Sequence, residues 1–310
     1  MKRSVIVLVV TALATPAIGH DYWLTSPSLV VPSDRDVGVH LLVGEHLVSE
    51  EDRQLETQRT PRIDLFHGTA KTDLFPAAVE GAMPAFNFSL KGGGGHLLVV
   101  DRVPAMVELD AARFEKYIQA EGHKGIIEER AKRGESASPG RERYRRNLKA
   151  LFQVGAARDS TFGIDAGQTI ELIPEQHPVF AAPGDTVTFR LTFRDKPLAN
   201  HHVVALSKGT GAVAVVHSAD YTTDADGRIK VAIDRRGEWL VRGVNMIRCE
   251  TECDANEWDS FWFAYSFANP EIAKPPAGIP MIAVIGGAAG AVILAGVAFL
   301  LLRRRSRTSR

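Results

Sequence analysis

The 310-residue sequence lacks an excess of one charge, a set of cysteines and a catalytic motif. Lys+Arg and Asp+Glu both number 37, so no overall field favours nucleic acid or an acidic ligand. Only two cysteines occur, which excludes a scaffold built from disulfides. The sequence contains no Gly-x-Ser-x-Gly, His-Glu-x-x-His or Walker motif. We therefore expect neither an enzyme nor a nucleic-acid-binding protein.

Both ends of the chain carry patterns of export and membrane anchoring. Residues 1–19 have a basic start, an apolar stretch and a small-x-small end, which is typical of a signal peptide. Residues 279–302 are uncharged and long enough, at ~1.5 Å per residue, to cross a hydrocarbon core of ~30 Å as a transmembrane helix. The basic tail 303–310 predicts a cytoplasmic C-terminus. The expected product is a single-pass inner-membrane protein with its main domains in the periplasm.

Cleavage after residue 19 would make His20 the first residue of the mature chain. A free N-terminal histidine offers two nitrogens, the α-amino group and the imidazole, which together can chelate one metal ion. These groups ordinarily titrate near pH ~7.7–8.0 and ~6.5, so both are available as neutral ligands around neutral pH. The alternative is that the cleavage site only happens to precede a histidine.

The pattern between the two ends predicts a mainly β protein with two antiparallel, immunoglobulin-like β-sandwich domains. Short strand patterns separated by Gly and Pro cover residues 20–165. Residues 168–268 contain about seven strand patterns in about 100 residues, which is typical of an immunoglobulin-like sandwich. A linker with two adjacent prolines, 269–278, leads to the transmembrane segment.

Helical periodicity interrupts the first domain over residues 110–152. Asp110 is placed to cap a first helix, a second covers 126–133, and a third begins at Ser138. The basic residues of the third helix could bind phosphate, or they could form a solvated face with arginine stems packed on the sheet. The apolar positions that define the first and third helices are Phe114, Tyr117 and Ile118, and Tyr144, Leu148 and Leu151.

The two cysteines, Cys249 and Cys253, are four residues apart and flanked by acidic residues. In an oxidising compartment we expect a disulfide that closes a small loop, and a soft-metal clip is the alternative.

Several short motifs through the exported region resemble, in their order, those of a known protein family. They are His20-Asp21-Tyr22-Trp23-Leu24, Gly44-Glu45-His46, Phe114-Glu115-Lys116-Tyr117-Ile118, Pro139-Gly140-Arg141-Glu142-Arg143-Tyr144, Thr223-Asp224-Ala225-Asp226-Gly227, Gly237-Glu238-Trp239 and Trp258-Asp259-Ser260-Phe261. The family consists of exported proteins with a domain of unknown function, described as a periplasmic component of nickel and cobalt uptake. The resemblance implies a metal-handling role beside a metal-uptake transporter in the membrane, and it places a histidine at the mature N-terminus. The two-cysteine segment is not part of this pattern.

The metal ligands we predict are His20, His46 and His96. His46 follows the end of one predicted strand and His96 begins another after a glycine run, so both could lie at one end of the first sandwich. Three imidazoles and an amine suit Cu(II) or Ni(II), with Co(II) possible, and Asp21 or Glu45 could accept hydrogen bonds from the imidazoles. The alternative is that His46 and His96 are surface loop histidines. His201-His202 is expected to be structural, because neighbouring strand residues face opposite ways.

The sequence therefore predicts a membrane-anchored, extracytoplasmic metal-binding accessory protein for uptake of nickel, cobalt or another transition metal. Two alternatives remain at this stage. One is a structural or adhesion-like sandwich protein without metal. The other is a copper-binding protein in which the N-terminal histidine forms an oxidative site.

Overall fold

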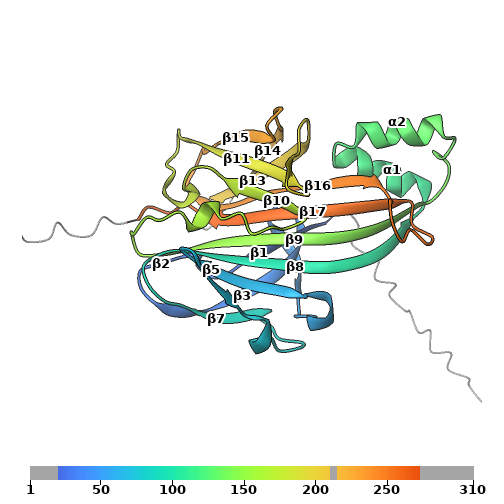
Figure 1. The fold of residues 1–310 in the computed structure, drawn as a ribbon. Helices are drawn as coiled ribbons and strands as arrows, with labels where there is room; N and C mark the ends of the chain where they lie inside the picture. The colour runs from blue at the N-terminus through green and yellow to red at the C-terminus, as the bar shows by residue number, and fades with distance from the viewer. Residues whose placement is uncertain (1–19, 210–214, 273–310) are drawn as a thin grey trace, which may run out of the picture. The chain divides into compact units, whose positions relative to one another are not determined.

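A computed structural model describes residues 20–209 and 215–272 and shows a mainly β protein, as expected (Figure 1). The expected signal peptide 1–19, transmembrane helix 279–302 and tail 303–310 lie outside the described residues, as does the linker beyond Ile272. Among the helices that the structure does describe, none combines the length and apolar character needed to cross a membrane.

One nine-stranded sheet runs through both halves of the described chain. Its order is β14 (Val216–Thr222), β13 (His202–Gly209), β16 (Gly237–Arg248), β17 (Trp258–Ala268), β9 (Gly140–Val154), β8 (Gly94–Leu109), β5 (Arg62–His67) and β6 (Ala70–Asp73), with β2 (Val30–Val31) also paired to β9. The pairing of β9 with β17 is parallel, from Glu142 opposite Trp258 to Ala150 opposite Ser266. This corrects the expectation of two separate antiparallel sandwiches, 20–165 and 168–268. The two regions share one mixed sheet, because a strand from each region pairs with the other at its centre.

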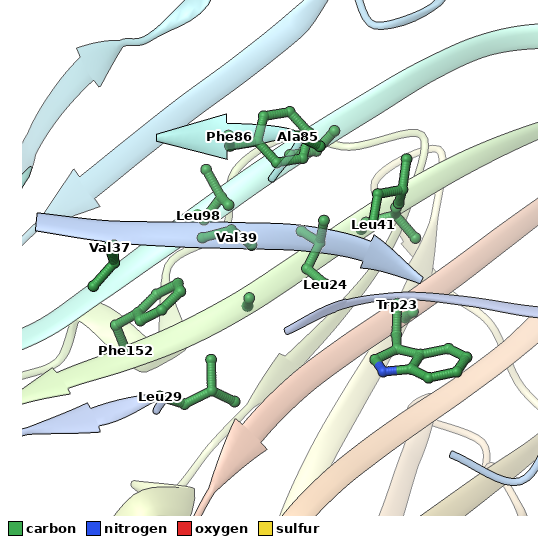
Figure 2. Packing of buried hydrophobic residues seen from close by; sticks show 14 of the residues in the cluster. Trp23, Leu24, Leu29, Val37, Val39, Leu41, Ala85, Phe86, Leu98 and Phe152 are labelled. Carbon is green, nitrogen blue, oxygen red and sulfur yellow. The ribbon is translucent and has the colours of Figure 1, made fainter. Parts of the chain in front are cut away.

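Two smaller sheets cover the two faces of this central sheet. The first contains β1 (Asp21–Thr25), β3 (Arg35–Glu45), β4 (Val48–Arg53) and β7 (Phe86–Leu90); the second contains β10 (Ile170–Pro174), β11 (Thr186–Phe193), β12 (Lys196–Pro197) and β15 (Arg228–Ala232). Neighbouring side chains of β8 point to opposite faces of the central sheet and so belong to different cores. Leu98 packs with the first smaller sheet and Leu97 with the second. Figure 2 shows Leu98 and Phe152 of the central sheet beside Val39 of β3 in the first core.

The helical insertion is shorter than the sequence predicts. Two helices form, α1 (Ala111–Ala120) and α2 (Lys124–Lys132), and Asp110 caps α1 by accepting a hydrogen bond from the Arg113 N–H at 2.9 Å. The third predicted helix is wrong, because residues 140–152 belong to strand β9. Leu148 packs in one core and Leu151 in the other, so the spacing that suggested one helical face distributes side chains over two faces of a sheet. Four 3₁₀ helices complete the described elements: Thr57–Arg59, Phe75–Ala77, Thr161–Gly163 and Pro178–Phe180.

The helices pack against the end of β9, β16 and β17. Phe114 and Tyr117 of α1 are buried with Trp258 and Trp262 of β17. Gly140 at the start of β9 permits this contact, because a Cβ there would lie 2.2 Å from Phe114 Cγ. Beyond the helices, Cys249 and Cys253 form the expected disulfide in the loop between β16 and β17.

Candidate functional site

His20 stands immediately before β1, and strand pairing sets its surroundings. Asp21 pairs with Gly44 of β3, which brings the imidazole of His20 to the end of β3. Its Nε2 lies 3.4 Å from Glu45 Oε1 and 3.6 Å from Glu50 Oε2. Its Nδ1 is buried and has no hydrogen-bond partner among residues 20–209 and 215–272. One ring nitrogen therefore faces two carboxylates while the other is unused.

This arrangement favours one tautomer of the His20 ring. Carboxylate oxygens accept hydrogen bonds, so a proton on Nε2 is stabilised by Glu45 and Glu50, and Nδ1 then carries the lone pair. Nδ1 is also the ring nitrogen nearer to the backbone nitrogen of the same residue. In a chain that begins at His20, the amine and Nδ1 together could close a chelate ring around one metal ion. In such a chain the amine and Nδ1 would be two nitrogen donors of the kind that transition metals take.

His46 lies at the same end of the first sheet as His20. It is exposed in the turn between β3 and β4 and has a positive φ of 53°. Burial raises the pKa of the nearby Asp21 carboxyl, and the charges of Arg242, Arg146 and His46 act against this rise. His46 is therefore the predicted ligand that the fold places nearest to His20, in the surface turn that the alternative interpretation expected.

His96 does not join the other two histidines. It is buried in β8, its ring stacks on His67 with centroids 4.1 Å apart, and its Nε2 lies 3.0 Å from the Lys91 carbonyl oxygen. The Gly92 N–H that follows Lys91 donates to Asp34, just before the start of β3, whereas His20 meets the far end of that strand. The 11 residues of β3 span roughly 33 Å. The predicted three-histidine site is thus not formed, because β3 holds its members at opposite ends.

We expected Asp21 or Glu45 to lie beside an imidazole, and the structure places Glu45 there and pairs Asp21 with an arginine. Asp21 Oδ1 lies 2.7 Å from Arg242 Nε on β16, and Arg242 also binds Glu121 at the C-terminal end of α1. This ion network joins the first strand, the central sheet and the helices. Glu45 keeps the expected place beside His20. Within the described part of the chain, no group of three or more His, Cys, Asp or Glu side chains is arranged to hold a metal ion.

Three further histidines form a cluster that the sequence did not predict. His123 follows α1, and its ring centroid lies 6.4 Å from that of His201. Burial lowers the pKa of His123 to about 3 and that of His201 to about 4. His202 is held by Asp220 at 2.7 Å and by the Glu121 carbonyl oxygen at 3.2 Å. The side chains of His201 and His202 point in opposite directions, as expected. His123 comes close to them only because α1 packs against the central sheet.

Comparison with known proteins identifies the family of this chain. The model of a domain of unknown function, DUF4198, matches residues 17–246. The chain belongs to this family. The description of the family assigns no activity. The match therefore supports membership of a domain family and says nothing about nickel or cobalt.

Other comparisons add little about function. No curated protein matches this chain. Among solved structures, the D0-D1 domain of Intimin aligns over 79% of this chain and 97% of its own, with 12% identity and a TM-score of 0.19. At that score the similarity carries no argument about fold or function.

Proposed function

We propose that this protein is a membrane-anchored, extracytoplasmic metal-binding protein that begins at His20 and serves as an accessory to the uptake of nickel, cobalt or another divalent transition metal. The observation that carries the proposal is the buried, unpartnered Nδ1 of His20, set beside the backbone nitrogen that cleavage would free. The family membership is compatible with this role but does not specify it.

Each part of the site has a separate task in this proposal. The His20 amine and Nδ1 supply two nitrogen ligands, and Glu45 and Glu50 hold the ring through Nε2. His46, in its exposed turn, is the candidate for a third nitrogen ligand. Nitrogen ligands favour Cu(II) and Ni(II) over Co(II). His96 has no part in the site, because it lies at the other end of β3.

A one-residue extension tests the chelate directly. The full chain is purified from membranes, its first residue is determined, and Ni(II), Co(II) and Cu(II) are titrated by calorimetry. Insertion of one alanine after Gly19 keeps the imidazole but moves the free amine away, so we expect binding weaker by about 100-fold, the usual scale for losing an intramolecular second contact. Affinity should also fall on acidification, because protons compete for both nitrogens.

Two substitutions provide the controls for this test. His20→Ala should abolish the same binding, whereas His217→Ala, an exposed histidine on β14, should leave it unchanged. Equal affinity of the native and extended chains would show that the N-terminus is not the site. Failure of every form to bind metal would favour a structural role for the protein.

A further inference from the structure

The disulfide between Cys249 and Cys253 closes a short loop at the surface, between β16 and β17. Both cysteines are partly exposed, and the three residues between them, 250–252, are exposed. A soluble thiol can therefore approach the loop without unfolding of the sheet. The loop also carries three exposed acidic side chains, those of Glu250, Glu252 and Asp254.

Two residues of the loop have an unfavourable backbone conformation. Glu252, which lies inside the ring, has a φ of 51°, and Asp254, just outside it, has a φ of 42°. Left-handed φ values bring the Cβ of an L-residue close to the following carbonyl oxygen, so they are rare for a residue such as glutamate. Opening of the ring frees Glu252 to leave this conformation, which favours reduction of the disulfide.

A cation lies beside one of the two sulfur atoms. Arg143 of β9 reaches the loop, and its Nη2 lies 3.8 Å from Cys249 Sγ. The same guanidinium donates to the carbonyl oxygens of Thr251 at 2.9 Å and Glu252 at 3.1 Å. Asp259 of β17 accepts hydrogen bonds from its Nε at 2.6 Å and its Nη2 at 2.9 Å. The position of the cation is therefore fixed by a strand as well as by the loop.

The two sulfur atoms differ in their surroundings as a result. Within residues 20–209 and 215–272, no lysine or arginine nitrogen contacts Cys253 Sγ as Arg143 contacts Cys249 Sγ. A neighbouring cation stabilises a thiolate. The acidic side chains of the loop oppose a thiolate at either sulfur, and Asp259 offsets part of the charge of Arg143. The contact with Arg143 is what distinguishes the two, and it favours a thiolate at Cys249.

We propose that the Cys249–Cys253 disulfide undergoes thiol–disulfide exchange with a dithiol reductant, and that Cys249 is the leaving group. A thiolate of the reductant attacks Cys253 Sγ and forms a mixed disulfide, while the Cys249–Cys253 bond breaks and its electron pair stays on Cys249 Sγ as a thiolate. The second thiolate of the reductant then attacks its own sulfur in the mixed disulfide and releases Cys253. The protein gains two electrons, the reductant becomes a disulfide, and its two protons pass to the cysteines or to solvent. The proposal does not rest on metal binding at His20.

Single-cysteine variants of the full chain measure the difference between the two sulfur atoms. Cys253→Ser leaves only the Cys249 thiol, and Cys249→Ser leaves only the Cys253 thiol. The rate of alkylation by iodoacetamide is followed against pH, and we expect its midpoint for Cys249 to lie lower by about one pH unit, because Arg143 stabilises the thiolate. Arg143→Gln should remove this difference. Arg141→Gln, at an exposed neighbour on β9 that pairs with Glu257, should preserve it.

The native full chain provides a second test with two thiol reagents. After brief exposure to reduced glutathione, fragmentation in a mass spectrometer should locate the adduct on Cys253 and the free thiol on Cys249. Dithiothreitol should reduce the bond completely while circular dichroism shows that the protein stays folded. An adduct mainly on Cys249, equal alkylation midpoints, or a bond that resists dithiothreitol until the chain unfolds would each overturn the proposal. If Arg143→Gln does not fold, the comparison of the two single-cysteine variants decides.

Discussion

Buried histidines make stability depend on pH at the scale of single residues. His201 is 9% exposed, and its Nε2 has no hydrogen-bond partner in the described chain. Its pKa is about 4 in the folded protein and near 6.5 in an unfolded chain. Between these values the unfolded chain binds more protons than the folded one, so acidification favours unfolding. Stability is full above pH ~6.5 and is lost as pH falls towards the folded value.

A substitution that does not titrate tests this linkage. Acidification from pH ~7.5 to pH ~5 should cost about 2 kcal/mol through His201, and His201→Gln should lose that part of the dependence. The measurement is the free energy of unfolding in urea at both pH values. His217→Gln, at an exposed position, should follow the native protein. An unchanged pH dependence in His201→Gln would contradict the assignment.

At the scale of elements, the contact between α1 and β9 depends on the absence of a side chain at Gly140. A Cβ at this position would meet Phe114 Cγ at 2.2 Å, and the Phe114 ring is fully buried against Trp258. A shift of the ring would disturb its packing against β17. The helices can approach the sheet this closely only because glycine occupies the first residue of β9.

Gly140→Ala should therefore destabilise the protein by about 1–3 kcal/mol, the usual cost of overpacking. Urea unfolding measures the loss. Gly125→Ala is the matched control, because a Cβ there meets nothing within 4 Å and alanine favours the helix. Equal stability of both variants would show that the helices are not packed on Gly140 as described.

The same elements show which features can be predicted from residues close together in the sequence. The cap at Asp110, the apolar face of α1 and the Cys249–Cys253 disulfide are set by residues close in sequence, and the sequence predicted them correctly. The helix predicted from Ser138 is a strand, because pairing with β8 and β17 outweighs a short helical spacing. The sequence also could not predict that His96 lies far from His20. That separation depends on which end of β3 each neighbouring strand reaches.

At the scale of the whole molecule, the shared sheet makes one unit of what the sequence divides into two domains. The described residues, 20–209 and 215–272, all fall within a single compact unit. Its central strands β9 and β17 come from the two sequence halves. Neither half can satisfy the backbone of its central strand alone, because each supplies one side of the pairing.

The two halves should accordingly unfold together. Hydrogen exchange of the full chain in increasing denaturant should show the same opening free energy for amides of β8, in the first half, and of β16, in the second. A chain cut after residue 165 should fail to fold and should be degraded rapidly by protease. Separate transitions for β8 and β16 would show that the halves are independent domains.

The parallel pairing of β9 with β17 also sets the order of events when the chain is made. Arg143 and Asp259, which join these strands by an ion pair, are 116 residues apart. At ~5–20 residues per second, β17 leaves the ribosome roughly 6–23 s after β9. Throughout that interval β9 presents an unpaired edge, and such an edge attracts other strands. Until β17 is made and paired, β9 therefore keeps an edge that favours aggregation.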